Sequence, residues 1–77
     1  MHIAGVIIHT LPENVNRVEA AIGSMEGAEI HAVEQGRLVV TVEGDDYQLT
    51  SDKVLELHQV DGVLSAALVY QHSEDES

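Results

Sequence analysis

The chain has 77 residues, and its 14 acidic and 3 basic residues give a formal net charge of −11. A chain of this length forms one domain, and this charge excludes binding to nucleic acids, because too few cations are present to displace the counterions of a phosphate backbone. With no cysteine, and with two tyrosines as its aromatic residues, the chain must form an aliphatic core that no disulfide or thiolate metal site supports.

The first segment, from Ile3 to Ile8, is apolar or small at every position. A half-exposed strand would alternate, so this pattern predicts a central strand of a sheet. No basic leader precedes the segment, and the apolar run is too short for a signal peptide or a membrane span. We therefore expect no membrane insertion and, because cysteine is absent, a cytoplasmic protein.

A helix near residues 11–25 is expected next. Thr10 and Glu13 have the spacing of a capping box, in which the Thr10 hydroxyl accepts a hydrogen bond from the Glu13 N–H. Gly27 is predicted to end the helix in a left-handed conformation. Apolar residues recur every three or four positions and predict a buried stripe that consists of Leu11, Val15, Val18, Ile22 and Met25.

Two strands joined by a tight turn follow, because Gln35-Gly36 has the form of a two-residue hairpin loop. Residues 28–33 alternate loosely, and one face of this strand consists of Ala28, Ile30 and Ala32. In residues 37–43 the predicted core face consists of Leu38, Val40 and Val42. The other face of that strand consists of Val39, Thr41 and Glu43.

A second helix is expected near residues 46–60, after Gly44-Asp45-Asp46 breaks the strand and offers an N-cap. Gly62 closes this helix, and a last strand follows that ends near residues 70–72. The segment Val60-Asp61-Gly62 echoes Met25-Glu26-Gly27, which predicts two copies of a strand, helix, strand unit. The apolar stripe of the second helix consists of Thr50, Val54, Leu57 and Val60, widened by Leu49 and Leu55.

This order of elements predicts an α+β fold of the ferredoxin-like type, βαββαβ, with a four-stranded antiparallel sheet and two helices on one face. Residues 1–72 would form the single domain, and residues 73–77 an acidic flexible tail. The opposite face of the sheet has no cover within the chain. Apolar residues on that face must meet either water or a partner.

The sequence offers no catalytic or cofactor site. Its five histidines are scattered, without a pair at helical ligand spacing, so we expect no metal. Neither a glycine-rich phosphate loop nor a nucleophile beside a base is present. The cluster of Glu43, Asp45 and Asp46 is explained by a strand end and a helix N-cap. We therefore predict a protein that is not an enzyme and holds no cofactor.

Three segments together resemble the NapD family, and the likeness runs from about residue 2 to residue 72. They are the opening at residues 2–9, the hairpin strand at residues 36–43, and the stretch from Val60 to Tyr70. NapD proteins are small chaperones of the periplasmic nitrate reductase system. The resemblance implies a cytoplasmic protein that binds the twin-arginine signal peptide of the catalytic subunit. By holding that peptide, it would delay export until the molybdenum cofactor and iron–sulfur cluster are in place.

The predicted peptide-binding surface is the open sheet face together with the acidic cluster. Apolar burial should set the affinity, while the acidic charge should raise the association rate with a cationic peptide. The residues assigned to this surface are Ile3, Gly5, Ile7, Val39, Thr41, Glu43, Asp45 and Asp46. We expect a monomer or a weak dimer. The sequence leaves open whether the peptide binds as a helix or a strand, and which way side chains point on the first and last strands.

Two alternative functions remain open on the sequence alone. A regulatory domain of the ACT type has the same topology and senses small molecules through loop glycines at a dimer interface. A structural assembly subunit would instead use the open face to oligomerise.

Overall fold

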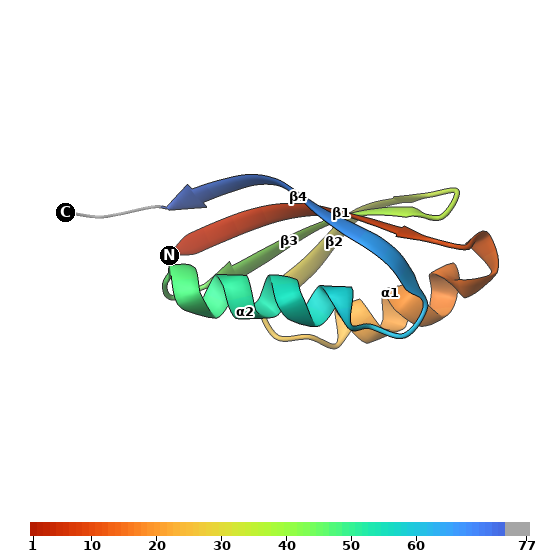
Figure 1. The fold of residues 1–77 in the computed structure, drawn as a ribbon, viewed down its shortest axis with the longest axis horizontal. Helices are drawn as coiled ribbons and strands as arrows, with labels where there is room; N and C mark the ends of the chain where they lie inside the picture. Colours follow the sequence, from red (N-terminus) through yellow and green to blue (C-terminus); the bar gives the residue numbers. More distant parts are fainter. Residues whose placement is uncertain (74–77) are drawn as a thin grey trace.

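The computed structural model describes residues 1–73, so the predicted acidic tail lies, apart from Ser73, outside the described residues. In chain order the elements are β1 (His2–Thr10), the 3-10 turn η1 (Pro12–Asn14), α1 (Val15–Gly23), β2 (Ala28–Glu34), β3 (Arg37–Gly44), α2 (Tyr47–His58) and β4 (Val63–Ser73). The strands form one antiparallel sheet in the order β2-β3-β1-β4, and both helices cover the same face of it (Figure 1). The predicted ferredoxin-like α+β fold is confirmed.

The core lies between the helices and the two central strands. Val18 and Ile22 of α1 and Leu57 of α2 are fully buried against the sheet. Residues that face each other across an antiparallel pair point to the same side, and the pairing of β1 with β3 aligns the buried residues of both strands. The strand residues of the core are Ala4, Val6, Ile8, Leu38, Val40 and Val42. The core face predicted for residues 37–43 is confirmed, and the structure decides the parity of β1, where Ala4, Val6 and Ile8 face the helices.

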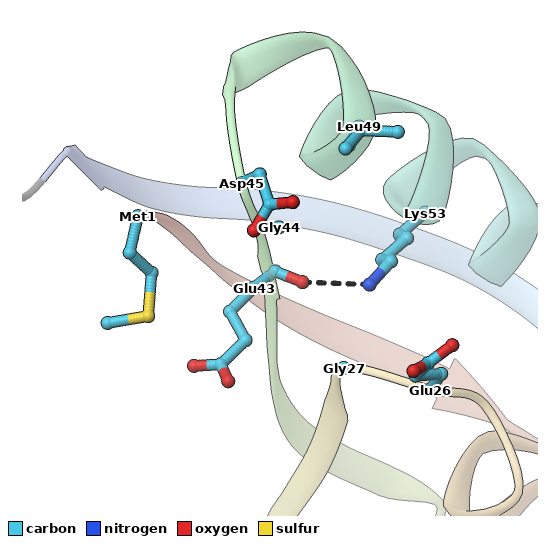
Figure 2. Close-up of a pocket in the computed structure, with 8 residues that line it drawn as sticks. All are labelled: Met1, Glu26, Gly27, Glu43, Gly44, Asp45, Leu49 and Lys53. Atoms are coloured by element: carbon cyan, nitrogen blue, oxygen red, sulfur yellow. Dashed lines mark hydrogen bonds between the residues drawn. The ribbon is translucent and has the colours of Figure 1, made fainter.

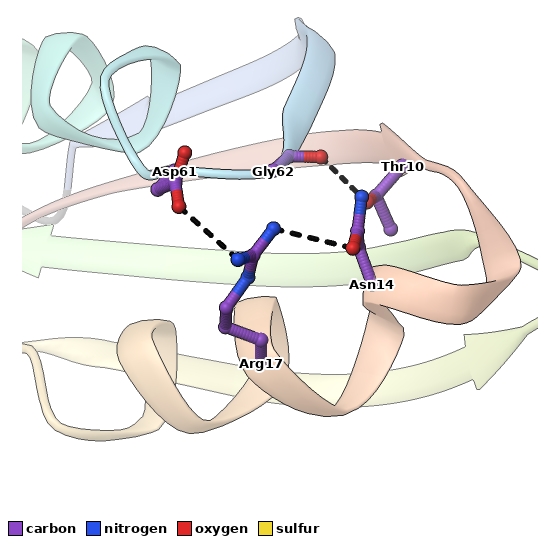
Figure 3. A network of polar contacts seen from close by, with 5 residues as sticks. All are labelled: Thr10, Asn14, Arg17, Asp61 and Gly62. Carbon is purple, nitrogen blue, oxygen red and sulfur yellow. Dashed lines mark hydrogen bonds and ion pairs between the residues drawn. The ribbon is translucent and has the colours of Figure 1, made fainter.

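The first helix begins later than predicted, and the capping box is wrong. The α-helix starts at Val15, after a 3-10 turn whose N-cap, Leu11, makes no side-chain cap bond. Thr10 instead belongs to β1, and its buried hydroxyl donates to the backbone oxygen of Gly62 at 2.6 Å (Figure 3). Since this partner is 52 residues away, no local pattern could reveal it. Leu11 is accordingly exposed rather than part of the stripe.

Figure 3 also shows how α1 is tied to the loop before β4. Arg17 forms an ion pair with Asp61 at 3.3 Å and donates to the side-chain oxygen of Asn14 at 3.2 Å. Both charged side chains of the pair are more than half exposed, so the pair adds on the order of 0.2–1 kcal/mol at most. The buried hydrogen bond of Thr10 is the stronger tie in this network.

Gly27 and Gly62 adopt the predicted left-handed conformation, with φ of 86° and 102°. The helices end before them, however, at Gly23 and His58, and their C-caps Ser24 and Gln59 are right-handed. The two glycines therefore turn the chain into β2 and β4 and are not helix caps. The hairpin loop at Gln35-Gly36 is confirmed, since both residues have positive φ, as a tight hairpin of this kind requires.

Two strands carry irregularities that the sequence does not show. In β2 the pairing with β3 shifts between Ile30 and Ala32, which leaves His31 as an extra residue. The shift places Ala32 opposite Val39 and Val33 opposite Leu38, so the predicted grouping of Ala32 with Ala28 and Ile30 is wrong.

In β4 the pairing with β1 shifts twice, at Leu64 and at Val69. Between these shifts Ala66 and Leu68 lie opposite Ile8 and Val6, which places both on the helix side of the sheet.

The second helix matches its prediction closely. Asp46 is its N-cap, and its side chain accepts from the Leu49 N–H at 2.9 Å. Thr50 and Leu57 are buried, as the stripe requires. Leu49 and Leu55 do not widen the buried stripe, because both side chains are largely exposed.

Candidate binding surface

The side of the sheet that faces away from the helices, here called the open face, carries the predicted residues of β1 and β3 as adjacent pairs. The register places Ile3 opposite Glu43, Gly5 opposite Thr41, and Ile7 opposite Val39. Ile3, Ile7, Val39 and Thr41 are half-buried, which is the state expected of a sheet surface with neighbours on each side but nothing above it. Six of the eight predicted site residues therefore lie together on the open face.

The edge strands extend the open face with residues that the sequence argument did not assign to it. Pairing with β1 adds Ala67 and Tyr70 of β4 on one side, and pairing with β3 adds Ala32 of β2 on the other. The sequence argument did not assign Tyr70 to the open face, because the bulge at Val69 decides to which side of the sheet its side chain points. Its ring lies over Gly5, where a Cβ atom would collide with it. Gly5 is thus buried beneath Tyr70, and the tyrosine ring forms the surface at this position.

One polar contact crosses the open face near its β2 edge. A ring nitrogen of His31 lies 2.8 Å from the Thr41 hydroxyl, so the predicted site residue Thr41 already has a polar partner within the protein. The apolar pair Ile7 and Val39 lies two positions along the central strands from Gly5 and Thr41.

An acidic recess adjoins the open face where β3 ends and α2 begins (Figure 2). Its volume is about 560 Å³, and the carboxylates that line it belong to Glu26, Glu43 and Asp45. Glu43 belongs to both features, because its place opposite Ile3 directs its side chain to the open face. The third predicted acid, Asp46, caps α2 with one carboxylate oxygen and does not line the recess.

Glu26 and Lys53 are members of this recess that the sequence argument missed. Lys53 donates from Nζ to the backbone oxygen of Glu43 at 2.9 Å, so its charge is held inside the recess (Figure 2). Glu26 comes next to Gly27, whose oxygen accepts from the Glu43 N–H at 2.8 Å. The sequence does show an acidic residue before each repeated glycine, at Glu26 and Asp61. Only the fold, however, brings Glu26 beside β3. Three carboxylates with one lysine leave the recess negative.

Among residues 1–73 no group of three or more histidine, aspartate or glutamate side chains has the arrangement of a metal site. His2 is buried, with Nε2 2.9 Å from the Gln71 side-chain oxygen. Within the same described part of the chain, no helix is both long and apolar enough to cross a membrane. The chemistry available at the open face and the recess is apolar contact and attraction of cations.

These features define a class of protein: small ferredoxin-like domains in which two helices cover one sheet face and the other stays open. A family model described as NapD protein matches residues 1–75, and the chain belongs to this family. The chaperone NapD of Haemophilus influenzae is 30% identical over 77 residues, which cover 97% of this chain and 82% of that protein. The chaperone NapD of Escherichia coli K12 is 22% identical over 76 residues, covering 96% of this chain and 87% of that one.

A solved structure has the same fold. It is the solution structure of the E. coli Tat proofreading chaperone protein NapD, with a TM-score of 0.84 and 24% sequence identity. The match covers 96% of this chain and 79% of that chain. The predicted family resemblance is confirmed.

Proposed function

We propose that this protein is a cytoplasmic chaperone that binds the twin-arginine signal peptide of the periplasmic nitrate reductase precursor. Bound in this way, the peptide is withheld from export until the cofactors of the catalytic subunit are inserted. Residues 1–72 act as one binding domain, as a monomer or weak dimer, without a catalytic step. Family membership supports this function over an ACT-type sensor or an assembly subunit, because the relatives are named chaperones.

The observation that carries the proposal is the open face beside the acidic recess. A signal peptide of this kind joins a positively charged segment to an apolar one. The protein offers the complement of each, since Ile7 and Val39 provide apolar surface and Glu43 marks the border with the carboxylates. Most of the chain's own cations are engaged away from the recess, as Arg17 pairs with Asp61 and Arg37 with Glu34.

The two parts of this surface contribute differently to binding. A peptide that covers on the order of 500 Å² of apolar surface would gain roughly 12 kcal/mol before the costs of association and ordering, which consume most of it. Each exposed arginine–carboxylate contact adds only about 0.2–1 kcal/mol. Apolar contact should therefore set the affinity, and charge should set the association rate and the choice of partner.

Isothermal titration calorimetry with synthetic signal peptides tests the proposal. The wild-type peptide should bind with a negative heat-capacity change, because apolar surface is buried. A peptide whose paired arginines are replaced by glutamine should bind more weakly, and the difference should shrink as salt is raised. Absence of binding by the wild-type peptide at concentrations of about 100 μM would refute the function.

A further inference from the structure

A second apolar surface lies on the helix side of the sheet, where α2 passes along β4. A groove of about 240 Å³ runs between the two elements and is lined by Tyr47, Val54 and Leu55 of α2 and by Leu68 of β4, among others. Tyr47, Leu55 and Leu68 are 59%, 60% and 45% exposed. Neither the core nor the open face uses these side chains. The groove is therefore a surface for which the proposed function gives no role so far.

The strand that borders the groove differs from an ordinary sheet edge. Natural edge strands are commonly blocked by charged side chains or proline, and β2 follows this rule with Glu29 and Glu34. By contrast, β4 contains no aspartate, glutamate, lysine, arginine or proline in its 11 residues. In a chain with 14 acids, this long uncharged stretch marks β4 as a place where an apolar partner can approach.

The two ends of this groove differ in charge, because Asp61, which precedes the start of β4, is paired with Arg17 at 3.3 Å. Asp45 and Asp46 come directly before Tyr47, at the start of α2. Ser73, the end of β4, lies opposite His2, so the same end of the sheet holds the start of β1 and the end of β4. Figure 1 shows these ends together beside the N-terminus. A ligand that is basic at one end and apolar along its length would therefore fit in one direction only.

We propose that the apolar segment following the arginine pair of the signal peptide docks in this groove. The arginines then lie near Asp45 and Asp46, and the apolar residues run along β4 toward Val63. This inference rests on the proposed function for the identity of the peptide. It adds a second apolar contact beyond the open face, and it fixes the direction of the peptide along the edge of the sheet.

A second copy of the chain fits the groove less well than a peptide. The groove exposes three large apolar side chains, those of Tyr47, Leu55 and Leu68, whereas a stable interface buries roughly 800 Å² on each partner. The bulges at Leu64 and Val69 interrupt regular pairing of two β4 strands. Two chains of charge −11 also repel each other, whereas a cationic peptide is attracted.

Leu55→Asp tests the groove, with Leu11→Asp as the matched control. Both leucines are exposed, but Leu11 precedes η1 and does not line the groove. By calorimetry, Leu55→Asp should weaken binding of the signal peptide at least tenfold, and Leu11→Asp should change it less than twofold. A peptide with serines in its apolar segment should bind both variants equally. Equal affinity of both variants for the natural peptide would overturn the groove as a site.

The direction is tested with a nitroxide spin label placed beside the arginine pair of the peptide. Amide signals of Tyr47 and Gln71 should broaden, while those of Gly62 and Val63 should not. The reverse pattern would overturn the direction. Sedimentation measures the oligomeric state of the free protein. A stable dimer that Leu55→Asp dissociates would assign the groove to a second copy of the chain and overturn peptide docking there. Failure of the wild-type protein to bind the peptide would instead refute the proposed function itself.

Discussion

The two faces of the sheet are built from the same central strands, yet their residues differ in burial. On the covered face, alternate residues such as Val6 and Val40 pack against both helices and are fully buried. On the open face, their sequence neighbours Ile7 and Val39 are also apolar but only half-buried. Since a strand with one solvated face normally carries polar residues there, the retained apolar residues indicate a surface kept for a partner. Substitutions on the covered face should therefore change mainly stability, and substitutions on the open face should change mainly peptide binding.

The largest expected effect is on the covered face. Leu57→Ala removes a fully buried side chain from the centre of the core, and we expect a loss of about 2–5 kcal/mol in the free energy of unfolding. Urea denaturation followed by circular dichroism measures it. Leu55→Ala, two residues earlier on α2 and 60% exposed, is the control and should cost much less. Similar losses in both variants would show that α2 does not bury Leu57 in preference to Leu55.

Val39→Asp should act on binding and spare the fold. The side chain lies on the open face opposite Ile7, so we expect a folded protein whose affinity for the signal peptide falls at least tenfold, or about 1.4 kcal/mol. Val33→Asp is the matched control, because Val33 lies opposite Leu38 on the helix side and is 39% exposed. Unfolding by Val39→Asp would assign Val39 to the core, and unchanged affinity would exclude the open face as the binding surface.

Thr10→Val tests whether a loss of stability on the covered face leaves peptide binding unchanged. Thr10 is buried and donates to the Gly62 oxygen, and valine retains the shape while removing the donor. We expect a loss of about 0.5–1.5 kcal/mol in unfolding free energy and no change in peptide affinity. Thr10→Ser, which keeps the hydroxyl, should recover most of the stability. A loss of affinity in the valine variant would mean that the two faces are coupled.

A smaller effect on affinity than that of Val39→Asp is expected from the acidic residues. Neutralising Glu43 and Asp45 as the amides, together with Asp46→Asn, which retains a good N-cap, should slow association several-fold and flatten its dependence on salt. Stopped-flow measurements at two ionic strengths provide the test. The dissociation rate should change little, because exposed charges act mainly through a long-range field. A dominant effect on dissociation would show that the carboxylates make close, desolvated contacts.

Much of the fold was predictable because it depends on neighbours in the sequence. Helical spacing predicted α2, and Asp46 followed as its N-cap. The Gln35-Gly36 pair predicted the hairpin, and alternation predicted the two faces of β3. The structure then placed Ile3, Gly5 and Ile7 of β1 on the open face, opposite Glu43, Thr41 and Val39. The start of α1 was predicted wrongly. The spacing of Thr10 and Glu13 is that of a capping box, but in the structure Thr10 is the last residue of β1 and a 3-10 turn precedes the helix.

The sequence by itself determined the order of the elements, the two faces of β3 and the excess of negative charge. Only the tertiary structure decided which atoms from distant segments meet: the Thr10 hydroxyl with Gly62, the Tyr70 ring with Gly5, and Glu26 with Glu43 at one recess. It also decided the bulges in β2 and β4, which redirect Ala32 and Tyr70. The physical reason is that periodicity reports the environment of one segment, whereas register and bulges are set by the fit between two strands.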